Sequence, residues 1–269
     1  MKKVDRLGWA VGLSLKTYGL RIGIRANDAT GLDLICRHLP NEWQSSSSTV
    51  VDRLYSIIIG GDTSRQNLRR FNLLYGDHVR LARSRDVDEV FDAFESDLRL
   101  VVAEFARHRV FVHAGVVGWK GEAILIPGRS YSGKSTLVSA LVKAGATYYS
   151  DEYAVLDFHG RVHPFHKPLE IRQEGSFKQS KINVEEIGTA GNKPLPVGLV
   201  LVTQYKKGVR WRPRKLTPGE GVLGLLAHTV SARRNPEKAL SALQRVAEGA
   251  RILKGARGEA EQIANAVLQ

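Results

Sequence analysis

The sequence predicts a mixed α/β protein, and three observations indicate this class. Short apolar stretches typical of buried strands alternate along the chain with longer stretches of helical periodicity. One such stretch, residues 123–126, leads into a glycine-rich segment, residues 128–135, and a helical pattern follows over 136–143. The contents of 43% hydrophobic and 25% charged residues are those of an ordinary globular protein. We therefore expect sheets with helices packed on them.

Residues 1–108 predict a smaller α+β domain. Its clearest element is a helix from Val87 to Phe105, where apolar residues fall at helical spacing; Asp86 followed by Glu89 predicts an N-cap with a capping box. No catalytic constellation occurs in this half, so packing, recognition or oligomerisation is its expected role. The other expected elements are a strand over 18–25, a helix over 32–39, a strand over 54–59 and a hairpin of 71–75 with 79–82.

Residues 109–269 predict a second domain with several strands. Asn235 and Pro236 indicate the start of a helix, because asparagine favours the N-cap and proline the first helical position. His159 and Gly160 indicate the turn of a hairpin. The expected strands are 110–112 with 114–117, 123–126, 146–149, 153–158 with 161–165, and 197–202; besides 136–143, helices are expected near 219–231, 235–253 and 259–268.

The segment G-x-x-x-x-G-K-S over residues 128–135 predicts a phosphate-binding loop, because it lies between an expected strand and an expected helix. Backbone N–H groups of a glycine-rich turn and the partial positive charge of a helix N-terminus supply the donors that a triphosphate needs. Lys134 would reach the β- and γ-phosphates, and the Ser135 hydroxyl would bind Mg²⁺. The candidate nucleotide-binding residues of this segment are Gly128, Ser130, Ser132, Gly133, Lys134, Ser135 and Thr136.

Two adjacent carboxylates, Asp151 and Glu152, follow the strand expected after this helix. A carboxylate in that place can orient Mg²⁺ or accept a proton from an attacking hydroxyl. Adjacent residues of a strand point to opposite faces, so either the strand ends between them or only one meets the phosphates. His113 lies between apolar residues of an expected strand, where a lone histidine is more often structural than catalytic.

The segment from His113 to Arg172 resembles the catalytic core of the HPr kinase/phosphorylase family. Those proteins carry a histidine and a glycine, a strand, a phosphate-binding loop, a helix, two acidic residues and later the sequence L-E-I-R-G. The same order appears here in His113-Ala114-Gly115, residues 128–135, Asp151-Glu152 and Leu169-Glu170-Ile171-Arg172. The second acidic residue is Glu rather than Asp, and Gln173-Glu174-Gly175 replaces the family's glycine-rich run.

The resemblance implies a role for each matching residue. Asp151 would act as the base on a serine hydroxyl, and His113 would lie beside it. Glu152 and Glu170 would help Ser135 to hold Mg²⁺, and Arg172 would lie near the phosphates or the acceptor. The implied fold is the nucleotide-binding core shared with phosphoenolpyruvate carboxykinases.

Composition limits the other possibilities. The net charge of +13 favours anionic partners such as nucleotides, nucleic acid, anionic lipid or an acidic peptide. The single cysteine, Cys36, excludes a disulfide within one chain and is consistent with a reducing cytosol. We recognise no signal peptide and no apolar run long enough to span a membrane, so we expect a cytoplasmic protein.

These observations predict an ATP- and Mg²⁺-dependent serine kinase. Its acceptor would be HPr, another small protein or a peptide, since shorter relatives of this type occur in peptide-modification gene clusters, including those for lasso peptides. The alternatives are a kinase of a small metabolite and an ATPase or nucleotide switch without an acceptor. A nucleic-acid-binding protein is the third possibility, but the sequence holds no zinc pattern or RNA-binding motif, and aromatic residues are only 7%. A homo-oligomer is compatible with the sequence.

Overall fold

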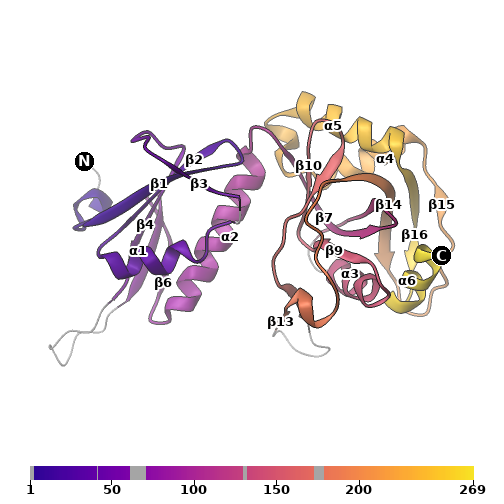
Figure 1. The fold of residues 1–269 in the computed structure, drawn as a ribbon, viewed down its shortest axis with the longest axis horizontal. Coiled ribbons are helices and arrows are strands. Elements are labelled where there is room, and N and C mark those ends of the chain that lie inside the picture. Colours follow the sequence, from indigo (N-terminus) through magenta and orange to yellow (C-terminus); the bar gives the residue numbers. More distant parts are fainter. Residues whose placement is uncertain (1–2, 41, 61–70, 130–131, 173–178) are drawn as a thin grey trace. The chain divides into compact units, whose positions relative to one another are not determined.

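The structure, a computed structural model, describes residues 3–40, 42–60, 71–129, 132–172 and 179–269 of the 269-residue chain. It confirms the mixed α/β class (Figure 1). The chain divides into two compact units, Met1–His108 and Arg109–Gln269.

The first unit is built on a six-stranded sheet with the strand order β3-β1-β2-β4-β5-β6. Helix α2 packs against β5 and β6, and α1 packs against β1, β2 and β4. A short 3-10 helix, Lys3–Arg6, precedes the sheet. The elements are β1 (Val11–Thr17), β2 (Leu20–Ala26), α1 (Ala29–Cys36), β3 (Gln44–Ser46), β4 (Arg53–Ile58), β5 (Asn72–Gly76), β6 (Val79–Ser84) and α2 (Val87–Phe105).

Two expectations about the first unit need correction. The expected strand over 18–25 begins later, because Tyr18 and Gly19 have positive φ angles of 47° and 84° and form the turn between β1 and β2. Asp86 is the N-cap of α2 as predicted, but its side chain accepts from the Asp88 N–H. The predicted capping box is absent, because the Glu89 carboxylate accepts a hydrogen bond from Ser84 instead.

The second unit contains an eight-stranded sheet with the order β11-β10-β7-β8-β14-β16-β15, in which β9 pairs with β7. A separate hairpin pairs β12 with β13. The strands are β7 (Val110–Trp119), β8 (Glu122–Pro127), β9 (Thr147–Ser150), β10 (Tyr153–Leu156), β11 (Arg161–His163), β12 (Leu169–Arg172), β13 (Gln179–Ile182), β14 (Leu195–Tyr205), β15 (Arg214–Lys215) and β16 (Arg251–Arg257). The helices are α3 (Lys134–Lys143), α4 (Pro218–Leu226), α5 (Pro236–Gly249) and α6 (Ala260–Leu268), with 3-10 turns at Val184–Glu186 and Val230–Arg233.

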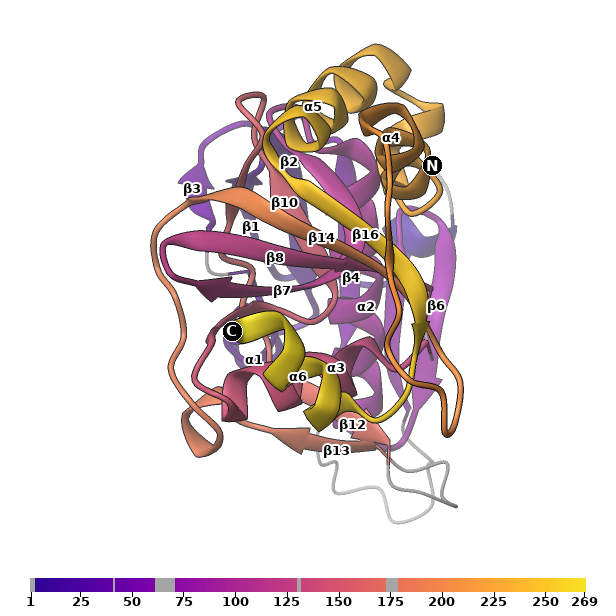
Figure 2. The same cartoon turned by 90° about the vertical axis from the view of Figure 1, so that its right-hand side faces the viewer.

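Helices cover both faces of this second sheet (Figure 2). Leu225 of α4 and Leu243 of α5 belong to one buried cluster with sheet residues such as Leu125. Leu137 of α3 and Ile263 of α6 belong to another cluster on the opposite side. Strand β8 contributes alternate residues to the two clusters, as expected for a strand buried on both faces.

Strand β16 was not predicted. The helix expected over 235–253 ends at Gly249, and the chain then pairs in parallel with β14, from Leu199 opposite Arg251 to Tyr205 opposite Arg257. Because β14 also runs parallel to β8, the carboxyl ends of β8, β14 and β16 meet at one edge of the sheet. That edge is where ligands bind in open α/β sheets. Among the described helices, none is long and apolar enough to cross a membrane.

Candidate active site

The glycine loop, residues 128–135, connects β8 to α3 at this carboxyl edge. Gly133 is the N-cap of α3 and has a left-handed conformation (φ 80°, ψ 19°), which a residue with a side chain adopts only with strain. A Cβ on Gly128 would lie 2.7 Å from Ser132 Oγ, so the loop is folded tightly on itself. The Gly128 N–H donates to the carbonyl oxygen of His113 on β7 (3.1 Å). Ser130 lies outside the described residues.

Lys134 is the first residue of α3 and is only 7% exposed. Its Nζ donates to the carbonyl oxygen of Arg129 within the same loop (2.8 Å). Burial lowers the pKa of Lys134 to about 8, although the carboxylates of Asp151 and Glu152 oppose this shift. The ammonium therefore lies near both predicted acidic residues and donates a hydrogen bond to a neutral carbonyl.

Ser135 and Asp151 come together although they are distant in sequence. Strand β9 ends at Ser150, and Asp151 follows in a bend before β10. The Ser135 hydroxyl donates to Asp151 Oδ2 at 3.1 Å, and Asp151 is 6% exposed. Tyr148 lies on the other side, with its hydroxyl 3.5 Å from Asp151 Oδ1. Asp151 is thus held beside the start of α3.

Glu152 forms an ion pair with Lys167 (Nζ to Oε2, 3.1 Å). Lys167 lies in the segment between β11 and β12, and its carbonyl oxygen accepts a hydrogen bond from the Tyr148 hydroxyl (2.9 Å). Tyr148 thereby contacts both Asp151 and the backbone that carries Lys167. The sequence interpretation missed Lys167, because nothing in the spacing around it indicates that it would meet Glu152.

Two histidines lie beside the glycine loop. Burial lowers the pKa of His113, and the Lys134 charge adds to the effect, while a hydrogen bond with the Gly128 backbone opposes it. Burial and the charges of Lys134 and Arg129 likewise lower the pKa of His228. The backbone joins the two, because the His113 N–H donates to the His228 carbonyl oxygen (2.8 Å). His228 follows α4 and was not predicted from the sequence.

Arg257, at the end of β16, is a further residue that the sequence interpretation missed. It is 2% exposed, and its Nη2 donates to the carbonyl oxygen of Gly133 at 2.7 Å. A Cβ on Gly133 would lie 2.6 Å from the same nitrogen. A second bond runs from Nη1 to the Gly258 carbonyl oxygen (3.2 Å). The guanidinium therefore fixes the carbonyl at the N-terminus of α3 and leaves no space for a side chain there.

The remaining predicted residues are Thr136, Glu170 and Arg172, and the side chains of the last two lie outside the part of the chain that the structure describes. Thr136 is exposed on the first turn of α3. Glu170 and Arg172 lie in β12, opposite Lys181 and Gln179 of β13.

Mg²⁺ prefers oxygen ligands and is often bound by one or two carboxylates together with substrate phosphates and waters. The hydroxyl of Ser135 and the carboxylate of Asp151 are oxygen donors that already converge, so this pair fits such an ion. No cluster of three or more His, Cys, Asp or Glu residues is found among the residues that the structure describes. An ion here would therefore depend on the phosphates for several of its ligands.

Comparisons with known proteins give no family assignment. No model of a known protein family matches the chain, and no curated protein matches it. Among solved structures, the chain is similar to the Hpr(Ser) kinase/phosphatase from Coxiella burnetii, with 16% sequence identity and a TM-score of 0.32. The match covers 59% of this chain and 96% of that one. The function proposed below rests on this chain's own geometry.

Proposed function

We propose that the chain is an ATP-dependent serine kinase, and that residues 109–269 form its phosphate-loop kinase domain. One observation carries the proposal: a buried lysine, a hydroxyl and a carboxylate meet at a helix N-terminus that follows a glycine loop. This combination suits a triphosphate, since the N–H groups of the first helical turn and the Lys134 ammonium would neutralise its phosphates. Phosphoryl transfer needs little more than positioning and charge stabilisation.

Each group has a proposed task in the transfer. Lys134 would exchange the Arg129 carbonyl for phosphate oxygens, and Ser135 would hold Mg²⁺. The ion, when bound, would neutralise charge on the transferring group. Asp151 would accept the proton of the serine hydroxyl as that oxygen attacks the γ-phosphorus and the bond to the leaving oxygen breaks. Glu152 would help to hold the metal, with Lys167 as its counter-ion.

Asp151 and Glu152 are both candidates for the base, and the proximity of Ser135 and Asp151 bears on the choice between them. Asp151 is bonded to the hydroxyl assigned to Mg²⁺, so it could hold the metal as well as receive a proton. Glu152 differs because its Oε2 is already paired with the Lys167 ammonium at 3.1 Å. Separate substitution of the two residues distinguishes the assignments.

The experiment incubates the protein with γ-labelled ATP and a panel of serine peptides, and follows labelled peptide and free phosphate separately. We expect labelled peptide with the wild type, and none with Asp151→Asn even when Mg²⁺ is raised. Glu152→Gln should retain transfer at raised Mg²⁺. Transfer by Asp151→Asn would refute the assigned base, and free phosphate without any labelled acceptor would indicate an ATPase or nucleotide switch instead.

The proposal also covers the role of the first unit and the class of the acceptor. Residues 1–108 would serve recognition or oligomerisation. The acceptor is a peptide or small protein, with a small metabolite as the alternative, and a cytoplasmic location, where ATP is abundant, stays a prediction.

A further inference from the structure

The positive charge of the chain is concentrated in the second unit. That unit contains 24 Lys and Arg against 13 Asp and Glu, whereas the first unit contains 16 against 14. Within residues 206–257 the ratio is 13 to 3. Solvated lysines and arginines scattered evenly over a surface would not produce such a concentration.

Most of them belong to two antiparallel segments, residues 206–216 and 251–257, which we call the basic ribbon. Strand β15 pairs with β16, with Arg214 opposite Lys254 and Lys215 opposite Leu253. Backbone hydrogen bonds join both ends of the ribbon: the Lys206 N–H donates to the Arg257 carbonyl, and the Leu216 N–H donates to the Ile252 carbonyl. Strand β15 is the last strand at this side of the sheet.

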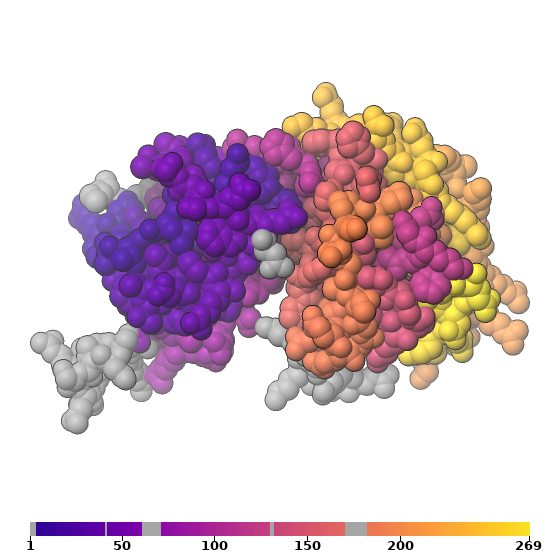
Figure 3. All heavy atoms as spheres, viewed as in Figure 1, coloured from indigo at the N-terminus to yellow at the C-terminus, as the bar shows by residue number. Residues whose placement is uncertain are grey.

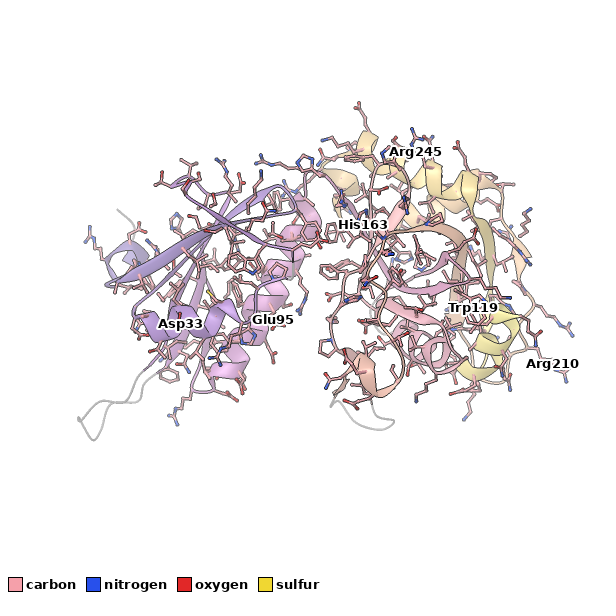
Figure 4. The ribbon with its side chains drawn as sticks, in the orientation of Figure 1. Asp33, Glu95, Trp119, His163, Arg210 and Arg245 are labelled. Carbon is pink, nitrogen blue, oxygen red and sulfur yellow. The ribbon has the colours of Figure 1, made fainter. Side chains whose placement is uncertain are left out.

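Apart from the buried Arg257, the cationic side chains of the ribbon are exposed. Arg210 points outward from the margin of the second unit (Figure 4), and Figure 3 shows light-orange side chains standing out where this segment runs. Glu220 pairs with Arg214 at 2.9 Å, and the Arg214 side chain stays 60% exposed. The exposed cations are Lys206, Lys207, Arg210, Arg212, Arg214, Lys215, Arg251 and Lys254.

The ribbon reaches the candidate active site. Segment 206–213 follows β14, and the glycine loop follows β8; since β8 and β14 are adjacent parallel strands, both segments leave the same edge of the sheet. Arg257 connects them directly, because its carbonyl accepts from Lys206 and its guanidinium donates to Gly133. The cations of 206–212 therefore lie at the edge where the acceptor of a phosphoryl group must arrive.

We propose that the basic ribbon is the docking surface for an acidic segment of the polypeptide that the kinase phosphorylates. This inference rests on the proposed function, because it assumes that the bound polypeptide is phosphorylated. The position of the surface and its preference for negative charge do not depend on catalysis. Carboxylates along such a segment would pair with the lysines and arginines of the ribbon, and the serine would enter beside the glycine loop. Charge complementarity of this kind increases association rates and specificity.

Protection of a sheet edge is the simpler explanation for charges on β15, since lysines there discourage edge-to-edge pairing. It accounts for Arg214 and Lys215 but not for the cations over 206–212, which precede the strand. A polypeptide occupant is favoured over nucleic acid because the proposed reaction consumes a serine hydroxyl. Nucleic acid remains an outcome that the experiment can return.

The test measures binding by fluorescence anisotropy with a labelled twelve-residue peptide that is rich in glutamate and has alanine in place of serine. The variant combines Lys206→Glu, Lys207→Glu and Arg210→Glu. The control combines Arg233→Glu, Lys238→Glu and Arg245→Glu, which changes the net charge equally at exposed positions outside the ribbon. We expect the ribbon variant to bind about tenfold or more weakly and the control to bind within about twofold of wild type. Thermal unfolding of both variants verifies that they fold.

Three results would overturn the proposal: equal binding by the ribbon variant and the wild type, equal weakening by the control, or tighter binding of a random DNA duplex than of the peptide. ATP binding is measured in parallel and should be the same in the ribbon variant and the wild type. A wild type that binds the peptide but not Mg²⁺–ATP would refute the kinase and leave the docking surface standing. A wild type that binds Mg²⁺–ATP but not the peptide would refute the docking surface and leave the kinase proposal standing.

Discussion

Each unit contains a cation that is at least half-buried, Arg53 in the first and Lys134 in the second, and the two cations are held in different ways. In the first unit, Arg53 donates to Asp97 (2.8 Å) and to Asp77 (2.7 Å), and Asp97 also accepts from Tyr55. Burial alone would lower the pKa of Arg53, but Asp97 and Tyr55 raise it above its ordinary value. In the second unit, burial lowers the pKa of Lys134 to about 8, and its Nζ donates a hydrogen bond to the neutral Arg129 carbonyl.

This difference separates a structural charge from one that is ready for a ligand. The charge of Arg53 is neutralised by carboxylates of its own unit, so Arg53 would not attract an anionic ligand. The charge of Lys134 is incompletely compensated, and it lies at a helix N-terminus that also attracts anions. We therefore expect changes at Lys134 to alter binding with little loss of stability, and changes at Arg53 to do the opposite.

The largest expected effect is on nucleotide binding by Lys134→Met. The change removes the ammonium from the proposed phosphate site, so we expect ATP affinity to fall roughly 100-fold or more, the cost of about two charged hydrogen bonds. The melting temperature without nucleotide should not fall, because the buried charge costs desolvation. Isothermal titration and thermal unfolding measure the two quantities. Lys143→Met, at the exposed end of the same helix, is the control and should retain ATP binding.

The reverse pattern is expected for Arg53→Met in the first unit. Removing one partner of a half-buried ion pair leaves Asp97 without its cation, so the free energy of unfolding should fall by about 2–3 kcal/mol. This is less than for a fully buried pair, because the Arg53 side chain is 21% exposed. Chemical denaturation measures the change, and Arg80→Met on the exposed part of β6 is the control. A loss of ATP affinity in Arg53→Met would contradict the separation of the two roles.

A smaller effect is expected for Arg257→Met. The Gly133 carbonyl would lose its donor, and the first turn of α3 would be less firmly placed, so ATP affinity should fall about tenfold. Arg257→Lys keeps the charge and one donor and should lie between this variant and the wild type. If Arg257→Met bound ATP normally, the contact with Gly133 would have no role in nucleotide binding. Arg251→Met, exposed on the same strand, is the control.

The last expected effect is a dependence on pH. The pKa of Lys134 is about 8 without nucleotide, and phosphates would raise it, since they favour the charged form. Binding should therefore take up protons between about pH 8 and 10, and affinity should fall by up to about tenfold per pH unit in that range. Titration calorimetry in buffers of different ionisation enthalpy measures the uptake. Lys134→Met should show none, and a wild type without uptake at pH 8.5 would contradict the lowered pKa.

The sequence was most informative where the pattern is local. The order strand, glycine loop, helix was predicted from contiguous residues, and so were α2 and the hairpin around Gly76 and Asp77. Strand β16 was missed because Ile252 and Leu253 continue the apolar pattern of α5, and only pairing with β14 decides that they form a strand. The capping box failed for a similar reason, since Ser84 competes for Glu89.

The candidate site residues that could not be predicted are those that long-range contacts bring to the site. Lys134 and Ser135 follow from one segment, whereas Lys167, His228 and Arg257 reach the site only through the arrangement of several strands and loops. A single sequence holds no spacing rule for such contacts. The sequence could therefore indicate the residues proposed to face the phosphates but not the residues that position them.

The hydrogen bond between Arg257 and Gly133 joins residues 124 positions apart, and this has a consequence for biosynthesis. A ribosome delivers the glycine loop long before it delivers β16. Until that strand docks beside β14, the first turn of α3 lacks its anchor. Under the proposed function, the nascent protein would therefore reach its full affinity for nucleotide only after β16 has docked beside β14.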